Sequence, residues 1–275
     1  LMNQQGVSEF WMPFATGALY LPGFLIAVWL LKQLPEPSAE DIAQRSARGV
    51  MDRQARWSFV REFALGLTLL IVAYTVLTAF RDFRDIYQAE LFAELYSDAA
   101  PGFLESQKAL FSKSETPVAF GVMGAMALLY FIRDNKRGFF AAFWLMGFGF
   151  ALVGLSALGE QSGRLGPLGF MIGTGLGAYL AYVPFNAILF ERMMAYTRFT
   201  GTAVFAIYLA DASGYTGAVG LQLWKALAAG EASRLEFFTD LCYLLSILGV
   251  VLVFFSAVYF ARKSTATEPD ATDLM

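Results

Sequence analysis

Long apolar runs separated by short polar segments dominate the pattern of hydrophobic and polar positions along the chain. A helix of about twenty apolar residues spans a bilayer. Seven runs reach or approach this length, and we expect each to be a membrane-spanning helix. They cover residues 10–31, 60–80, 117–133, 138–159, 167–190, 202–225 and 237–261. The sequence therefore predicts an all-α, polytopic membrane helix bundle with seven transmembrane helices.

The charges between the apolar runs predict the orientation of the chain, because Lys and Arg are enriched in cytoplasmic loops. Basic residues gather in four regions that fall on one side of the membrane if the runs alternate in direction. These regions are 32–61, 133–137, 192–198 and 262–263. The opposite connections are acidic or balanced. We therefore expect a protein of the cell (inner) membrane whose chain begins as a fragment outside and ends in the cytoplasm.

Composition excludes several classes of protein. Of the 275 residues, 57% are hydrophobic and 16% are charged, whereas soluble domains have about 25% charged residues. A net charge of −3 without a basic tract does not indicate a nucleic-acid partner. The chain has no His, and its single Cys242 excludes an intrachain disulfide and a multi-cysteine metal site. No paired carboxylates or Ser/Lys dyad lie within a run, so we expect no enzyme, catalytic residue, metal or cofactor.

Two connections are longer than the rest, and each predicts an additional short helix. On the inner side, Ser38 and Asp41 resemble a capping box and predict a helix through about Arg56. This helix either lies on the anionic inner leaflet or is a solvated connector. On the outer side, an apolar stripe from Leu91 to Leu95 predicts a short interfacial helix. The polar tail 264–275 is expected to be disordered.

Asp211 carries the strongest functional signal. A carboxylate near the middle of a membrane-spanning helix costs roughly 2.5–3.5 kcal/mol on insertion scales. Tyr208 lies three residues before it and Tyr215 four residues after it, so the three side chains share one helical face. Asp211 either couples or gates the movement of a proton or cation, or is a structural carboxylate held by hydrogen bonds.

Charged residues also close the run 60–80, in the string Arg81-Asp82-Phe83-Arg84-Asp85. Arg81 and Asp85 are four residues apart and can pair on one helical face. In a functional interpretation, Arg81 and Arg84 face a cavity and bind an anionic group while Asp82 and Asp85 orient them. In the alternative, the string is a self-neutralising helix end at the outer boundary.

The run 167–190 combines a glycine face with a polar stripe. Gly169, Gly173 and Gly177 recur every four residues and predict close approach of another helix. The polar stripe lies on a shared face beside Pro184, which is expected to kink the helix, and consists of Tyr179, Tyr182 and Asn186. The stripe either lines a cavity or forms interhelical hydrogen bonds.

The fifth run closes on the inner side with Glu191 and Arg192. Charge clusters in short inner loops can lock one conformational state of a membrane protein. A purely topogenic role explains the same pair, because basic residues near a helix end help to set orientation.

With the first run set aside, six runs form two groups of three, and an odd number of spans inverts the second group relative to the first. This arrangement resembles the rear half of a major facilitator superfamily (MFS) transporter. The resemblance implies that 1–31 is the last helix of an N-terminal front bundle and 32–57 a cytoplasmic central loop with an amphipathic helix. It implies that 58–263 is a six-helix rear bundle of two inverted three-helix repeats.

Three strings are similar to a bacterial membrane family of unknown function, of the DUF5690 type. They are Arg81-Asp82-Phe83-Arg84-Asp85, Val183-Pro184-Phe185-Asn186 with Phe190-Glu191-Arg192, and Tyr208-Leu209-Ala210-Asp211 with Gly214-Tyr215. The loop 133–138 departs from the superfamily, because it keeps an acidic-basic-glycine character without the full signature.

The superfamily resemblance implies the C-terminal portion of a secondary active transporter that moves a small polar solute, anionic or zwitterionic, by alternating access. It implies cavity-lining roles for Tyr74, Thr78, Arg81, Asp82, Tyr179, Tyr182 and Asn186, with Asp211 coupling or gating. The implied partners are membrane lipids, the N-terminal six-helix half of the same transporter, the solute, and a proton or sodium ion. The alternative is a non-transporting membrane sensor or scaffold, in which the polar residues pair internally.

Overall fold

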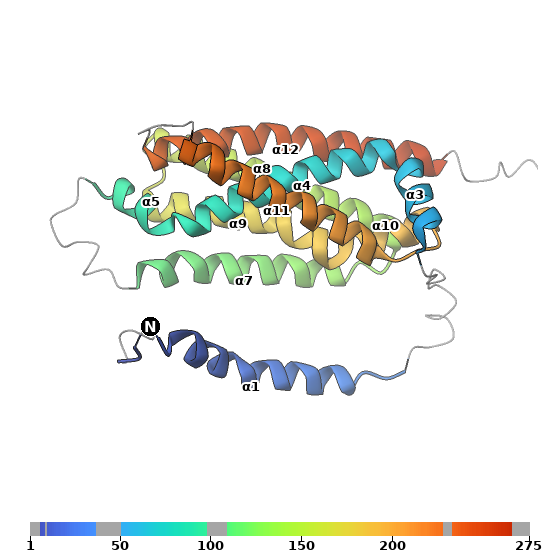
Figure 1. Ribbon diagram of the computed structural model, residues 1–275, viewed down its shortest axis with the longest axis horizontal. Coiled ribbons are helices and arrows are strands. Elements are labelled where there is room, and N and C mark those ends of the chain that lie inside the picture. The colour runs from blue at the N-terminus through green and yellow to red at the C-terminus, as the bar shows by residue number, and fades with distance from the viewer. Residues whose placement is uncertain (1–5, 9, 37–50, 98–108, 228–232, 266–275) are drawn as a thin grey trace, which may run out of the picture. The chain divides into compact units, whose positions relative to one another are not determined.

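The structure is a computed structural model, and it describes residues 6–8, 10–36, 51–97, 109–227 and 233–265. The described part of the chain is helical and contains no strand. It divides into two units, Leu1–Arg45 and Ser46–Met275, which are considered separately. The first unit contains α1 (Met12–Lys32), a helix with no buried residue (Figure 1).

The described residues of the second unit form ten helical elements. They are α3 (Arg53–Glu62), α4 (Ala64–Ile86), α5 (Gln88–Leu95), α7 (Leu110–Tyr130), α8 (Asn135–Gln161), α9 (Pro167–Pro184), the π-helical η2 (Phe185–Leu189), α10 (Phe190–Thr197), α11 (Ala203–Leu227) and α12 (Arg234–Thr265). All seven apolar runs are therefore helical.

Six helices among the described residues are long and apolar enough to cross a membrane. They are Met12–Lys32, Ala64–Ile86, Asn135–Gln161, Pro167–Thr197, Ala203–Leu227 and Arg234–Lys263. This confirms a multi-pass, all-α membrane architecture. The remaining long helix, α7, has Lys113 and Glu115 in its first turns. It begins at Leu110 rather than at residue 117. The prediction of seven spans therefore depends on whether α7 also crosses the membrane.

The short helices differ in part from their expectations. The outer helix exists as α5, but Leu91 and Phe92 are 0% and 1% exposed and belong to the core instead of an interface. The inner helix expected from Ser38 falls largely outside the described residues. The described segment begins a new helix at α3, where the Asp52 side chain accepts the Ala55 N–H at 2.8 Å. Helix α12 continues to Thr265, and the rest of the tail is outside the described residues.

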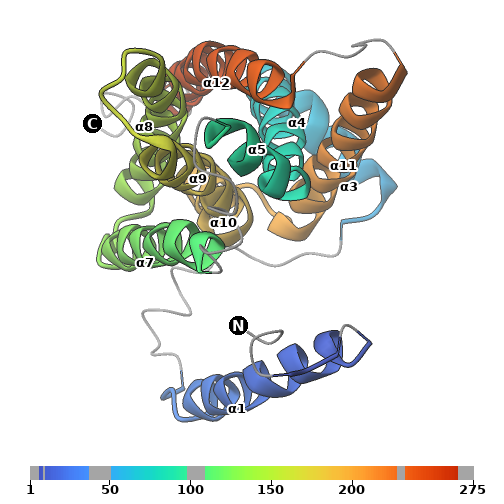
Figure 2. The ribbon, with the colours of Figure 1, turned by 90° about the vertical axis from the view of Figure 1, so that its left-hand side faces the viewer.

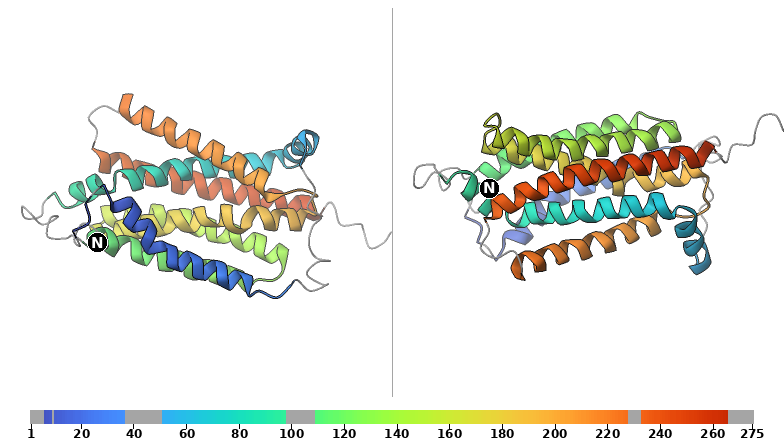
Figure 3. Two further views of the ribbon diagram at one scale, coloured as in Figure 1. Left: turned by 60° about the horizontal axis from the view of Figure 1, so that its bottom comes forward. Right: turned by 90° about the horizontal axis from the view of Figure 1, so that it is seen from above.

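Two helices organise the packing of the second unit. Helix α4 packs against α11 and α12, while α9 packs against α7 and α8. Helix α8 also packs against α12, which joins the two groups (Figures 2 and 3). Successive long helices run in opposite directions, so α3, α10 and the end of α12 lie at the same end of the unit (Figure 1). The basic regions of the second unit thus gather at one end.

Glycine faces permit the closest helix contacts. A Cβ on Gly177 of α9 would lie 2.6 Å from the Gly149 carbonyl oxygen of α8, a distance that only glycine tolerates. The predicted close approach of another helix is confirmed for Gly173 and Gly177, which meet α8, but not for Gly169, which meets only Leu165. On α11, a Cβ on Gly214 would lie 2.9 Å from the Tyr74 ring and 2.8 Å from the Thr78 hydroxyl of α4. These approaches allow short polar contacts between α4 and α11.

Candidate functional site

A hydrogen-bonded trio joins three helices inside the bundle. The Tyr74 hydroxyl of α4 donates a short hydrogen bond to Asp211 of α11. The Asn186 side chain of η2 donates to the same hydroxyl oxygen at 3.0 Å. Tyr74 is 0% exposed, whereas Asp211 is partly exposed and Asn186 is exposed. The trio therefore has a buried hub and polar groups that open at the surface of the unit.

The local backbone explains why Asn186 reaches the trio. Proline lacks the N–H that an α-helix needs, and Pro184 ends α9. The five residues Phe185–Leu189 then form a π-helical turn before α10 resumes. Single π-turns inside α-helices change the direction of side chains and are frequent at functional sites. The expected kink beside Asn186 is confirmed as this π-helical turn.

A row of aromatic and charged groups continues from the trio along α4. The Tyr182 ring stacks on the Tyr74 ring, with centroids 5.4 Å apart and an interplanar angle of 21°. The Arg81 guanidinium lies 4.1 Å from the centroid of the Tyr182 ring. It also pairs with Asp82 at 2.7 Å, so Arg81 has aromatic and ionic contacts together. Arg81 thus pairs with its neighbour, not with Asp85 as its spacing allowed.

A second polar cluster surrounds Arg84, which is 0% exposed. Its guanidinium pairs with Asp85 at 3.2 Å and with Glu115 of α7 at 2.8 Å. It also donates to the Met171 carbonyl oxygen of α9 at 3.0 Å. The Tyr179 hydroxyl donates to Asp85 at 2.8 Å. Arg84 was expected to face a cavity, but the structure buries it as a tie between α4, α7 and α9.

The other predicted site residues do not join these clusters. Thr78 is buried, and its hydroxyl has no hydrogen-bond partner within the described residues. Tyr208 and Tyr215 are 68% and 55% exposed, so the hydroxyl that bonds Asp211 belongs to Tyr74 of another helix. Glu191 is exposed and forms no ion pair in the described part of the chain.

Arg192 ties α10 to the connection between α7 and α8. It donates to the carbonyl oxygens of Ile132 at 2.8 Å and Arg133 at 3.2 Å, and to the Asn135 side chain at 2.9 Å. Arg192 thus links α10 to the start of α8 and to the residues that precede it.

Sequence reasoning missed several members of the clusters. Glu115 was missed because the apolar run was expected to begin at residue 117. Gln88 was also missed, and its side chain donates to the Glu115 carboxylate. Between α4 and α11, the Thr75 hydroxyl donates to Ser213 at 3.0 Å. The signal that would have identified Glu115 is the polar segment just before residue 117, which forms the first turns of α7. Within the described ranges, no three His, Cys, Asp or Glu side chains are grouped to hold a metal ion.

Comparison with known proteins gives one match. A family model described as a family of unknown function (DUF5690) matches residues 1–263. No curated protein matches the chain. No solved structure matches it either. The match covers both units of the structure, including every cluster described above.

Proposed function

The chain belongs to the family of unknown function DUF5690, and we propose that it is the C-terminal portion of a secondary active transporter. The hydrogen-bonded trio of Tyr74, Asn186 and Asp211 carries this proposal. A carboxylate within a membrane-spanning helix is costly, so such residues commonly mark solute or ion pathways. The solute would be small and polar, either anionic or zwitterionic, and a proton or sodium ion would drive it.

The partial exposure of the trio supports a cavity wall. Asn186 is exposed, and Asp211 and Tyr182 are partly exposed on neighbouring helices. Together with Arg81 they offer hydrogen-bond acceptors, donors and a positive charge along one row. A solute that carries a carboxylate or phosphate beside a neutral polar group suits this combination. The opposite wall would come from a front bundle.

Helix contacts support the superfamily architecture and its repeats. We assign α4, α7 and α8 to one repeat, and α9 with α10, α11 and α12 to the other. In this assignment α4 corresponds to α9, α7 to α11 and α8 to α12. The contacts of α4 with α11 and α12 then correspond to the contacts of α9 with α7 and α8. Inverted repeats of this kind place binding sites at the repeat interface near the midplane. The proposal also includes seven membrane spans, of which α7 is the third. It places the basic end of the bundle in the cytoplasm.

Gradient-driven uptake tests the proposal. The full-length protein is reconstituted in vesicles with an imposed proton or sodium gradient, and a mixture of anionic and zwitterionic solutes is supplied outside. Mass spectrometry of the vesicle contents identifies any solute that accumulates. We expect gradient-dependent accumulation by the wild type and none by Asp211→Asn, because the variant lacks the charge that couples to the ion.

Asp240→Asn is the matched control, since Asp240 is an exposed carboxylate on α12 away from the trio. Its uptake should equal that of the wild type. Normal uptake by Asp211→Asn would remove Asp211 from the mechanism. Thermal unfolding and gel filtration establish that each variant is folded.

A non-transporting sensor or scaffold is the second candidate, and the burial of Arg84 favours it. A guanidinium held by two carboxylates and a carbonyl is a static tie and exposes nothing to a solute. This candidate predicts that the folded wild type accumulates no solute under either gradient.

A further inference from the structure

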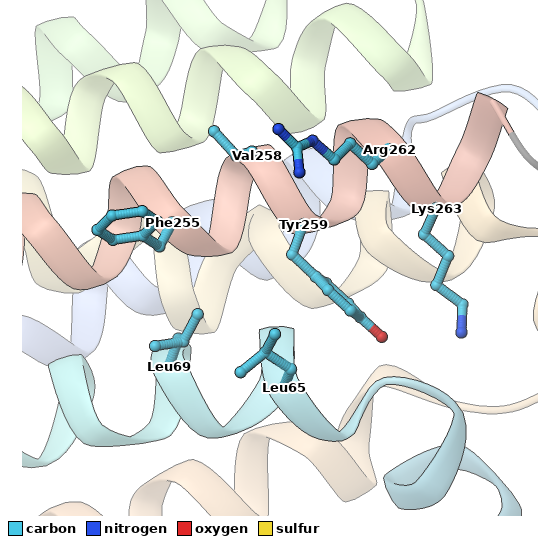
Figure 4. A pocket seen from close by; sticks show the side chains of 7 residues that line it. All are labelled: Leu65, Leu69, Phe255, Val258, Tyr259, Arg262 and Lys263. Carbon is cyan, nitrogen blue, oxygen red and sulfur yellow. The ribbon is translucent and has the colours of Figure 1, made fainter.

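A groove with a basic end runs between α4 and α12 on the surface of the second unit. It has a volume of about 640 Å³ and is lined by Leu65, Leu69, Phe255, Val258, Tyr259, Arg262 and Lys263 (Figure 4). Leu65 and Phe255 are 59% and 56% exposed, so the groove has an open apolar wall. This volume lies within the ordinary range for small-molecule sites.

The bounds of the candidate spans lead us to expect that the groove extends from the membrane boundary into the bilayer. Leu65 is the second residue of the span Ala64–Ile86, and Lys263 is the last residue of the span Arg234–Lys263. From Arg262 back to Phe255 the helix covers seven residues, or about 10 Å at 1.5 Å per residue. Its basic end therefore lies at the depth of lipid headgroups, and its apolar part lies at the depth of acyl chains.

Hydrogen bonds hold the basic end in place. Tyr259 donates to the Glu62 carbonyl oxygen at 3.0 Å, and the Lys263 ammonium donates to the same oxygen. The ammonium also lies 4.9 Å from the centroid of the Phe63 ring. Figure 4 shows Tyr259 and Lys263 extending from α12 toward α4, while Arg262 lies along α12 beside Val258. Two cationic side chains on α12 thus line this end of the groove, with Lys263 directed toward α4 and Arg262 beside Val258.

The charged residues in the lining are both cations. The seven lining residues include two cations and no carboxylate. A neighbouring hollow on α3 adds Trp57 and Arg61, together with Glu62. Trp and Tyr are typical of the membrane–water interface, where an apolar ring and a polar edge are both accommodated. A ligand for this place needs an apolar tail and a negatively charged head.

We propose that this groove binds an anionic phospholipid. One acyl chain lies along Leu65, Leu69 and Phe255, and the headgroup phosphate lies between Arg262 and Lys263 with the Tyr259 hydroxyl at its edge. Anionic lipids are concentrated in the cytoplasmic leaflet, which is the side expected for this basic end. The site is separate from the trio and does not depend on transport.

A second groove supplies an internal contrast. It lies between α8 and α12 with a volume of about 540 Å³ and is lined by twelve uncharged residues, among them Trp144 and Phe254. Acyl chains can cover it without preference for a headgroup. Only the groove between α4 and α12 should distinguish an anionic lipid from a zwitterionic one.

Native mass spectrometry of the full-length protein in detergent tests the proposal, with titrations of phosphatidylglycerol, phosphatidylcholine and inorganic phosphate. We expect wild-type protein to prefer phosphatidylglycerol over phosphatidylcholine. Arg262→Gln combined with Lys263→Gln should lower the affinity for phosphatidylglycerol roughly 30-fold, because two charges near the phosphate are lost. Binding of phosphatidylcholine should be unchanged.

Two further variants exclude simpler explanations. Leu65→Trp fills the groove without changing its charge and should also weaken phosphatidylglycerol binding. Lys136→Gln combined with Arg137→Gln removes two exposed cations at the same end and should leave it unchanged. Equal binding of the two lipids, equal loss in the control, or competition by inorganic phosphate alone would overturn the proposal.

Discussion

The two polar clusters on α4 differ in the kind of group that each of them buries. Tyr74 and Arg84 are ten residues apart on one helix. Both are 0% exposed, but Tyr74 connects to an exposed Asn186 and a partly exposed Asp211. Arg84 meets two carboxylates and a carbonyl oxygen within 3.2 Å. One cluster buries a neutral hydroxyl and the other buries a charge, while the partners of both reach the surface: the Asp85 and Glu115 side chains are 41% and 39% exposed.

The difference follows from the cost of burying each group. An isolated buried charge is far more expensive than a buried hydroxyl, so a buried guanidinium needs several acceptors at once. Arg84 therefore ties three helices together in one arrangement. A tyrosine hydroxyl needs only one or two partners, and Tyr74 can exchange them at lower cost. We infer that rearrangement during function involves the Tyr74 cluster and leaves the Arg84 cluster intact.

The largest expected effect tests the Arg84 cluster. Arg84→Leu should destabilise the protein by about 2 kcal/mol, because the hydrogen bonds of the buried guanidinium to Glu115 and to the Met171 carbonyl oxygen are lost. Thermal unfolding in detergent measures the loss. Arg81→Leu is the matched control, since Arg81 is 14% exposed and pairs with one carboxylate, so that its ion pair should contribute about 1 kcal/mol or less. Equal losses for both variants would remove the contrast between the clusters.

An intermediate effect is expected in the Tyr74 cluster. Tyr74→Phe and Asp211→Asn each weaken the hydrogen bond that joins α4 to α11. In a double-mutant cycle of unfolding free energies, the two should couple by about 1 kcal/mol, a typical value for one hydrogen bond between membrane helices. Strict additivity would mean that the contact contributes nothing to stability.

The smallest effect concerns Glu94, at the acidic end of the bundle. Partial burial acts to raise its pKa, but hydrogen bonds from Ser233 and from the backbone of Leu235 and Arg234 outweigh it and lower the pKa from 4.5. The carboxylate thus stabilises the start of α12, where an anion is favourable. This stabilisation is present above the unfolded pKa and is lost as the pH falls through the lower, folded pKa.

Glu94→Gln should therefore reduce stability by roughly 0.3–1 kcal/mol at about pH 7. The difference from the wild type should shrink as the pH falls below about 4. Thermal unfolding across this pH range measures it. A difference that stays constant with pH would show that the charge of Glu94 is not responsible.

The pattern of apolar runs predicted each long helix, because a helix in a bilayer must be apolar over most of its length. It also predicted the glycine face that meets Gly149 and the kink beside Asn186. It was less accurate where a helix begins with charged residues. Helix α7 starts seven residues before the predicted boundary, and Glu115 was missed for that reason.

Residue spacing also identified which polar side chains share a helical face, and it selected Asp211 as the residue most in need of a partner. Spacing within one helix cannot reveal which helix packs against that face. Only the tertiary structure decided that Tyr74 of α4 bonds Asp211, and that Arg84 is enclosed by α7 and α9. Such contacts depend on where helices cross and how closely they approach, which here is set by glycines far apart in the chain.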